Sequence, residues 1–195
     1  MNWSDQYKVL WYTPMRAATR SAGFIMWYYN FESDHDGRVP NHSRFIPKGK
    51  EDYYYIVNVR NPYSRLVSLY YLLNLHHQKK FDFSFENWID KMYETSILVE
   101  MNSLCISDCV QKKPDKLIRV ENIDDDIKSL FFLDLKDKSL QEIIEQKIKK
   151  NLFENEFDFP KKNWKDYYDQ RLADRVYSIC EKDFINFEYD KNSWK

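Results

Sequence analysis

Two polar segments of this sequence combine basic side chains, hydroxyls and small residues in a way that suits anion binding. The first runs from Thr13 to Ser21 (TPMRAATRS) and follows an apolar, aromatic stretch. Backbone N–H groups at a helix start, joined by hydroxyls and two guanidiniums, would form a cradle for a phosphate or sulfate. The same residues would also make an ordinary strand-to-helix turn with an N-cap, so this segment alone leaves both interpretations open.

The second polar segment runs from Arg60 to Tyr70 (RNPYSRLVSLY) and follows the apolar stretch YYYIVNV. Arg60 stands at the end of that stretch, and Ser68 lies about two turns into the helix predicted to follow. A guanidinium fork and a hydroxyl at these positions could converge on one anion. Taken in isolation, the two positions are explained as well by an ion pair of Arg60 and by packing of Ser68.

Other kinds of site find less support in the sequence. The phosphate-binding loop of nucleotide triphosphatases needs glycines and a lysine in the pattern G-x-x-x-x-G-K-[ST], and neither segment has them. This absence weighs against a kinase-like or other nucleotide-processing α/β enzyme. No histidine and cysteine spacing is typical of a metal site, so we expect no metal.

The stretches around the two segments predict strands that alternate with helices. Predicted strands are Tyr7–Tyr12, Tyr53–Val59 and Lys116–Val120. Predicted helices are Ala22–Tyr29, Pro62–Leu73, Ser84–Met92, Ser96–Val110, Asn122–Phe132, Ser139–Leu152 and Lys165–Ile185. The polar, turn-rich residues from Asn30 to Pro47 predict a long connection.

This alternation predicts a three-layer α/β domain around a central parallel sheet, with ligands bound beyond the carboxyl ends of the strands. The strand Tyr53–Val59 is too apolar for a solvated edge and should lie inside the sheet. A chain of 195 residues, of which 43% are hydrophobic, is near the usual size of one domain, so we predict a single domain over residues 1–195.

Composition and charge argue against a protein that binds nucleic acid or spans a membrane. The formal net charge of −1 provides no overall field to attract nucleic acid or an anionic membrane. The sequence has neither a signal-peptide pattern at Met1 nor an apolar run of membrane-spanning length, and its three cysteines are odd in number. We therefore expect a soluble, cytoplasmic protein with reduced thiols.

The string from Arg60 to Tyr70 resembles the 3′-phosphate-binding motif of sulfotransferases that use 3′-phosphoadenosine 5′-phosphosulfate (PAPS), R-[DN]-P-x-x-R-x-x-S-x-Y. It is most similar to the carbohydrate sulfotransferases, of the Golgi type that acts on uronyl and heparan-like substrates. Residues Arg16–Ser21 fall where that family has its 5′-phosphosulfate loop, K-x-G-[ST]-[ST]-S. Ile118–Asn122 resembles the family pattern I-x-x-E-[ND]-[LI], and Asp183–Asp190 resembles D-F-x-x-F-x-Y-D.

The resemblance implies a P-loop-like sulfotransferase fold that transfers a sulfuryl group from PAPS to a hydroxyl, here of a glycan, without a metal. It assigns the 3′-phosphate to Arg60 and Ser68. It assigns the phosphosulfate to the loop residues Arg16, Ala17, Ala18, Thr19, Arg20 and Ser21. The alternative is a relative that binds the nucleotide but no longer transfers sulfate.

Two departures from the family pattern motivate that alternative. Arg16 replaces the catalytic lysine, with Met15 inserted before it, and Ala18 replaces a glycine. A guanidinium cannot donate its proton but can hold developing negative charge, and a phosphate leaves without protonation. We therefore predict that Arg16 is catalytic. Ala18 fits the loop without strain only if its backbone avoids positive φ.

The acceptor hydroxyl needs a general base, for which histidine is a usual choice. His42, in Asn41–Phe45 (NHSRF), resembles the base histidine of the uronyl-type branch, so we predict that it is catalytic. His35 is the competing candidate, and a solvated loop histidine is the alternative explanation of His42.

A late loop of the sequence adds cations and a ring. Related enzymes fold a basic and aromatic flap over the nucleotide, and Lys161, Lys162 and Trp164 stand at the corresponding place. The lysines could contact phosphate while the indole stacks on adenine. A solvated lysine pair beside a half-buried tryptophan explains these residues equally well.

Overall fold

A computed structural model describes residues 1–34, 42–76, 84–94, 105–134, 136–137, 142 and 162–195. The chain divides into two compact units. The sheet unit contains Met1–Val59 and Val110–Asp158, and the helical unit contains Arg60–Cys109 and Phe159–Lys195. A single functional domain over residues 1–195 stays a prediction.

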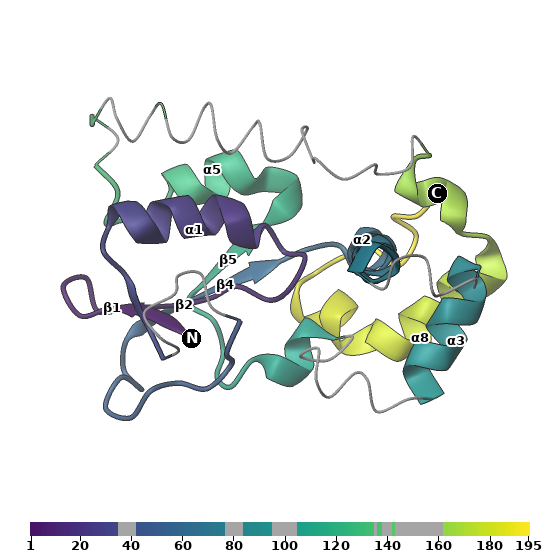
Figure 1. Ribbon diagram of the computed structural model, residues 1–195, viewed down its shortest axis with the longest axis horizontal. Coiled ribbons are helices and arrows are strands. Elements are labelled where there is room, and N and C mark those ends of the chain that lie inside the picture. Colours follow the sequence, from purple (N-terminus) through teal and green to yellow (C-terminus); the bar gives the residue numbers. More distant parts are fainter. Residues whose placement is uncertain (35–41, 77–83, 95–104, 135, 138–141, 143–161) are drawn as a thin grey trace. The chain divides into compact units, whose positions relative to one another are not determined.

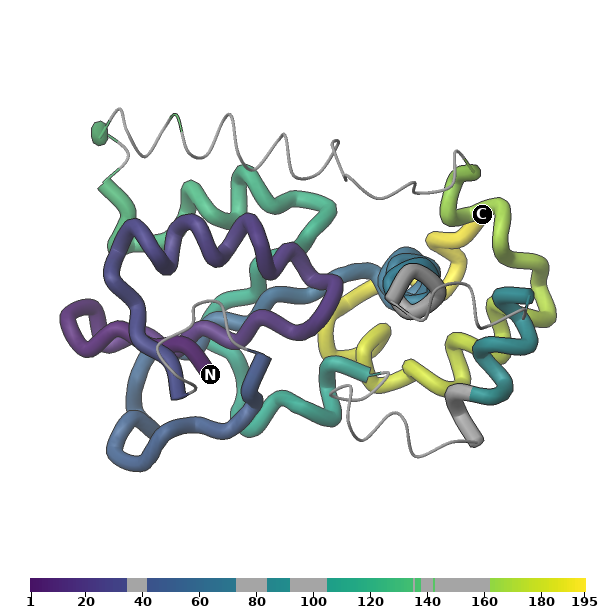
Figure 2. Tube along the Cα trace, viewed as in Figure 1, coloured from purple at the N-terminus to yellow at the C-terminus, as the bar shows by residue number. Residues whose placement is uncertain are grey.

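The sheet unit is built on five strands in the order β3-β1-β2-β4-β5. Their bounds are Asn2–Ser4 (β1), Val9–Tyr12 (β2), Glu32–Ser33 (β3), Tyr54–Val59 (β4) and Lys116–Arg119 (β5). Figure 1 labels β1, β2, β4 and β5, and Figure 2 follows the same chain along its Cα trace. Strands β2, β4 and β5 pair in parallel, as predicted. Strand β1 is antiparallel to both β2 and β3, so the sheet is mixed, and the predicted parallel arrangement holds for β2, β4 and β5.

The antiparallel pairing of β1 depends on local features that the apolar pattern of the sequence does not reveal. Strand β1 has only three residues, two of them the polar Asn2 and Ser4. Asn2 is buried and its side-chain amide donates to the carbonyl of Trp11 at 2.9 Å. Lys8, at the end of the turn into β2, takes a positive φ of 55°, which a tight reversal between antiparallel strands favours.

Strand β4 lies between β2 and β5, as its apolar composition predicted. Tyr12 pairs with Val57, and Val59 pairs with Arg119. Because these strands run in the same direction, the residues that follow β2 and β4 leave the sheet at the same edge. The residues after β2 form the loop Thr13–Ala18 and then the first turn of α1, so the Thr13–Ser21 segment begins at this edge.

Helices α1 (Thr19–Tyr28) and α5 (Ile123–Lys128) cover one face of the sheet (Figure 1). A short 3₁₀ turn, η2 (Val120–Asn122), leads into α5. The side chains that fill this interface are buried and mostly aliphatic: Val9, Trp11, Ala22, Ile25, Met26, Ile56, Ile118, Ile123 and Ile127. The sheet unit therefore contains a sheet layer and a helix layer, and the third layer stays a prediction.

The helical unit contains α2 (Pro62–His76), α3 (Phe85–Glu94) and α8 (Gln170–Asn186), with the 3₁₀ turns η1 (Ile106–Cys109) and η4 (Trp164–Tyr167). Helices α2 and α3 were predicted to within a few residues. The helix predicted over Lys165–Ile185 is divided, because Asp169 accepts the N–H of Leu172 at 2.8 Å and starts α8 anew.

Two predicted helices lie largely outside the described residues. Of Ser96–Val110, only the end is described, and it forms η1 rather than an α-helix. Of Ser139–Leu152, only Glu142 is described. The helix predicted over Asn122–Phe132 is shorter than expected and ends at Lys128. No helix within the described ranges is both long enough and apolar enough to cross a membrane.

Candidate functional site

The loop between β2 and α1 has a backbone conformation that would suit an anion. Ala18, the N-cap of α1, takes the left-handed conformation at φ 54° and ψ 34°, and the right-handed helix begins at Thr19. Successive residues of opposite hand turn their N–H groups into one concavity. Alanine has no side-chain oxygen, so Ala18 does not cap the first N–H groups of α1.

The positive φ of Ala18 means that the condition for an unstrained alanine at this position is not met. Arg16 is also left-handed, at φ 66°, so two residues of the loop carry a side chain where glycine is favoured. Each such residue costs about 1–2 kcal/mol. The loop persists because local bonds oppose that cost: Pro14 accepts the Ala17 N–H at 3.2 Å and the Thr19 hydroxyl at 3.1 Å.

The buried side-chain amide of Asn58 also holds this loop. Asn58, on β4, donates its Nδ2 to the carbonyl of Ala17 at 2.8 Å and accepts the indole N–H of Trp11 at 2.7 Å. All three residues are fully buried. The sequence analysis did not single out Asn58, although the one polar residue inside an otherwise apolar interior strand is a signal that could have found it.

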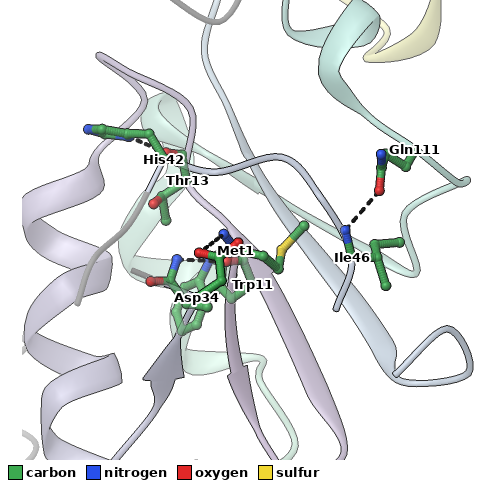
Figure 3. A network of polar contacts seen from close by, with 8 residues as sticks. Met1, Trp11, Thr13, Asp34, His42, Ile46 and Gln111 are labelled. Atoms are coloured by element: carbon green, nitrogen blue, oxygen red, sulfur yellow. Dashed lines mark hydrogen bonds and ion pairs between the residues drawn. The ribbon is translucent and has the colours of Figure 1, made fainter. Parts of the chain in front are cut away.

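His42 lies beside the start of the same loop (Figure 3). Its Nδ1 is 2.7 Å from the carbonyl oxygen of Thr13. A carbonyl only accepts, so Nδ1 carries the hydrogen and neutral His42 has its lone pair on Nε2. The segment after His42 is fixed at Ile46, whose N–H donates to Gln111 at 2.8 Å. His42 thus has the tautomer that suits a general base.

In the helical unit, Arg60 lies against the face of α2 that carries Ser64 and Ser68. Its Nε donates to the Ser64 hydroxyl at 2.9 Å. Ser64 and Ser68 are four residues apart, and side chains at that spacing lie one above the other on a helix. The half-buried guanidinium and the buried Ser68 hydroxyl are therefore presented along one helix face.

The corner that carries Arg60 is fixed by the end of the chain. Asn61 caps α2 by accepting the Tyr63 N–H at 3.0 Å, and its amide donates to Ser193 at 2.8 Å. The hydroxyl of Tyr63 donates to the carbonyl of Lys191 at 2.7 Å. Residues 191–193 therefore hold the first turn of α2, a role that the sequence analysis did not predict.

Arg65, the second arginine of the Arg60–Tyr70 string, is structural. Its side chain is only 1% exposed. It lies close enough to the buried Asp183 for its charge to oppose the rise that burial causes in the pKa of that carboxyl. Asp183 accepts the N–H groups of Ile106 at 2.8 Å and Ser107 at 2.7 Å, so it joins α8 to η1.

The predicted flap residues are described in part. The ammonium of the exposed Lys162 lies 4.7 Å from the centre of the Tyr167 ring. Trp164 is half-buried in η4, and its ring centre is 6.5 Å from that of Tyr168. These contacts fit the solvated lysine and half-buried tryptophan, and a nucleotide contact stays a prediction. Lys161 and His35 lie outside the described residues.

The structure therefore brings the predicted residues together in two groups, one in each unit. His42 adjoins the Thr13–Ser21 loop, and Arg60 adjoins the face with Ser68. Among the residues that the structure describes, no three His, Cys, Asp or Glu side chains are grouped to hold a metal ion.

Comparison with known proteins yields one match. Neither the curated proteins nor the solved structures gave one. A family model described as the sulfotransferase family matches residues 29–190, which include His42, the Arg60–Tyr70 string and the Asp183–Asp190 ending, and begin after the Thr13–Ser21 loop. The matched span is most of the chain, and the chain therefore belongs to the sulfotransferase family.

Proposed function

We propose that this sulfotransferase moves a sulfuryl group from PAPS to a hydroxyl of a carbohydrate. The observation that carries the proposal is the bond from Arg60 to Ser64, which holds a guanidinium on the helix face of Ser68. ATP has no phosphate on its 3′-oxygen, so a paired guanidinium and hydroxyl dedicated to a 3′-phosphate distinguish PAPS from the common nucleotides.

The loop Arg16–Ser21 suits the 5′ end of the donor. Its concavity at Ala18 and Thr19 presents backbone N–H groups, and the positive end of the α1 dipole adds to their attraction for an anion. Arg16 and Arg20 add two positive charges to the same loop. We assign the phosphosulfate to this cradle and the 3′-phosphate to Arg60 and Ser68.

Chemistry at this loop follows from the residues beside it. When bound, the donor supplies an activated sulfuryl group and a phosphate that leaves without a proton. Nε2 of His42 takes the proton of the acceptor hydroxyl as the new oxygen–sulfur bond forms. The Arg16 guanidinium stabilises the charge that develops on the oxygen of the breaking bond. The released nucleotide is 3′,5′-adenosine bisphosphate.

A carbohydrate acceptor is supported by the segment that carries His42. Phe45 is 61% exposed, and the Arg44 guanidinium lies 5.4 Å from the centre of its ring. An exposed ring three residues from the base offers an apolar face to a sugar. The resemblance to the carbohydrate branch favours the same acceptor class.

A second candidate function is nucleotide binding without transfer. It is favoured by Arg16, which stands at the position of the family lysine in a left-handed conformation. Both functions predict donor binding, and only the first predicts turnover.

Two measurements on the full chain test these functions. Thermal unfolding with 3′,5′-adenosine bisphosphate should raise the melting temperature, whereas ATP at the same concentration should raise it less. Equal shifts would remove the 3′-phosphate assignment. Transfer of radiolabelled sulfate from PAPS to a panel of sugars and phenols then separates the candidates. Donor binding with no labelled product on any acceptor would favour the non-transferring relative.

A further inference from the structure

We propose that Asn58 is a positioning residue for the donor loop, and that its buried amide directs the backbone N–H of Ala18 toward the phosphosulfate. This inference rests on the proposed function. Asn58 does not touch the donor in this proposal. It acts through the peptide bond between Ala17 and Ala18.

The orientation of the Asn58 amide is determined by its two partners. The indole of Trp11 can only donate, so it requires the amide oxygen of Asn58, and their atoms are 2.7 Å apart. Nδ2 then faces the carbonyl of Ala17, which can only accept, at 2.8 Å. All three residues are fully buried, so water does not compete for either bond.

Peptide geometry connects this bond to the cradle. A trans peptide is planar, and its C=O and N–H point in opposite directions. The carbonyl of Ala17 points at the buried Asn58, so the N–H of Ala18 in the same peptide points away from the core. That direction is toward the concavity at the start of α1, where an anion would accept it.

The bond is needed because the loop is strained. Rotation of the peptide between Ala17 and Ala18 would let Ala18 leave its left-handed conformation at φ 54°. The same rotation would turn the N–H away from the anion. Asn58 opposes it, because the rotation would break the bond to Ala17 and leave a buried amide N–H without a partner.

The test compares two ligands that report on opposite ends of the donor. Adenosine 5′-phosphosulfate has the group assigned to the loop, and adenosine 3′-monophosphate has only the group assigned to Arg60 and Ser68. Calorimetry on the full chain should show that Asn58→Leu weakens binding of adenosine 5′-phosphosulfate about tenfold, the factor expected for one orienting hydrogen bond. Binding of adenosine 3′-monophosphate should stay within about twofold.

Two further variants separate positioning from general damage. Trp11→Phe keeps an aromatic ring but removes the indole donor, so it should give a smaller loss with the same ligand selectivity. It also serves if Asn58→Leu does not fold. Ala18→Gly makes the left-handed conformation easy. Combined with Asn58→Leu, it should recover part of the lost affinity for adenosine 5′-phosphosulfate, which a packing defect would not allow.

The possible results distinguish failure of the proposed function from failure of this inference. Wild-type protein that binds neither ligand overturns the proposed function and this inference with it. Wild-type protein that binds both, with Asn58→Leu and Trp11→Phe unchanged toward adenosine 5′-phosphosulfate, overturns the inference alone. Equal losses for both ligands, without recovery by Ala18→Gly, would make Asn58 a structural residue only.

Discussion

The Nδ1 atom of His42 lies 2.7 Å from the carbonyl oxygen of Thr13. This bond ties a residue of the Asn30–Pro47 connection to the first residue after β2. It also sets the tautomer of the neutral ring, because a carbonyl only accepts and Nδ1 must donate. The proposed base is thus oriented by the backbone of the loop that is proposed to hold the donor.

Replacing His42 by Ala should lower kcat at least about 100-fold, since general base catalysis contributes at least that much. Donor affinity should be retained. Steady-state transfer and calorimetry with 3′,5′-adenosine bisphosphate check both parts. Ser43→Ala, one residue away, is the control. Full activity of His42→Ala would move the base role to His35 or to a carboxylate.

Replacing Arg60 by Ala should weaken 3′,5′-adenosine bisphosphate binding about tenfold or more, because hydrogen bonds to charged groups contribute about 1.5–3 kcal/mol. ATP binding should change little. The matched control is Arg175→Ala, in the same unit, where an exposed pair with Asp90 at 3.6 Å contributes little. Unchanged affinity in Arg60→Ala would exclude Arg60 as the 3′-phosphate ligand.

Replacing Arg16 by Lys should preserve transfer, because either cation can stabilise charge on the leaving oxygen. Arg16→Ala should lower kcat by about 100-fold, the usual cost of removing one such stabilising group, with a smaller effect on donor binding. Single-turnover kinetics separates the two effects. Turnover by Arg16→Ala equal to that of the wild type would show that Arg16 is not catalytic.

Replacing Ala18 by Gly should be neutral or stabilise the fold by up to about 1 kcal/mol. Relief of the left-handed cost, about 1–2 kcal/mol, exceeds the entropy that glycine adds to the unfolded chain, about 0.4–1 kcal/mol. Urea unfolding measures the change. The same substitution at Ala22, inside α1, should instead destabilise by about 1 kcal/mol or more. Equal destabilisation at both positions would contradict the observed φ of Ala18.

The Asp183 carboxyl should titrate above an ordinary aspartate, because burial raises its pKa more than its hydrogen bonds and Arg65 lower it. With a pKa raised on folding, its contribution to stability is present below the unfolded pKa and is lost as pH rises through the folded pKa. Asp5 should titrate lower than usual, because Lys50 and Tyr53 bond to its carboxylate. Carboxyl NMR compares the two residues in one sample, and an Asp183 value below that of Asp5 would contradict this account.

Much of the sheet could be predicted because a buried strand appears in the sequence as a continuous run of apolar residues. The apolar run at β4 and the Asn61–Pro62 start of α2 identified an interior strand and the helix after it. Strands β1 and β3 were missed, because two or three residues with polar side chains carry no alternation.

The candidate site was predicted unevenly. His42, Arg60 and the Arg16–Ser21 loop are predicted as site residues because side-chain chemistry and family resemblance agree there, and these assignments stay predictions. The support for these residues was not predicted: the backbone hand of Ala18 and the amide of Asn58 depend on tertiary contacts between separate segments. The cytoplasmic location expected from the sequence stays a prediction.

If Arg60 holds the 3′-phosphate as proposed, the two bonds from residues 191–193 to Asn61 and Tyr63 give this segment a part in nucleotide recognition. Arg60 directly precedes the first turn of α2, which these two bonds hold in place. Trimming or proteolysis near Ser193 would break them and free the backbone that carries the Arg60 guanidinium. An affinity tag placed near Ser193 would act on the same two bonds. Donor affinity would then report on whether residues 191–193 keep their bonds to Asn61 and Tyr63.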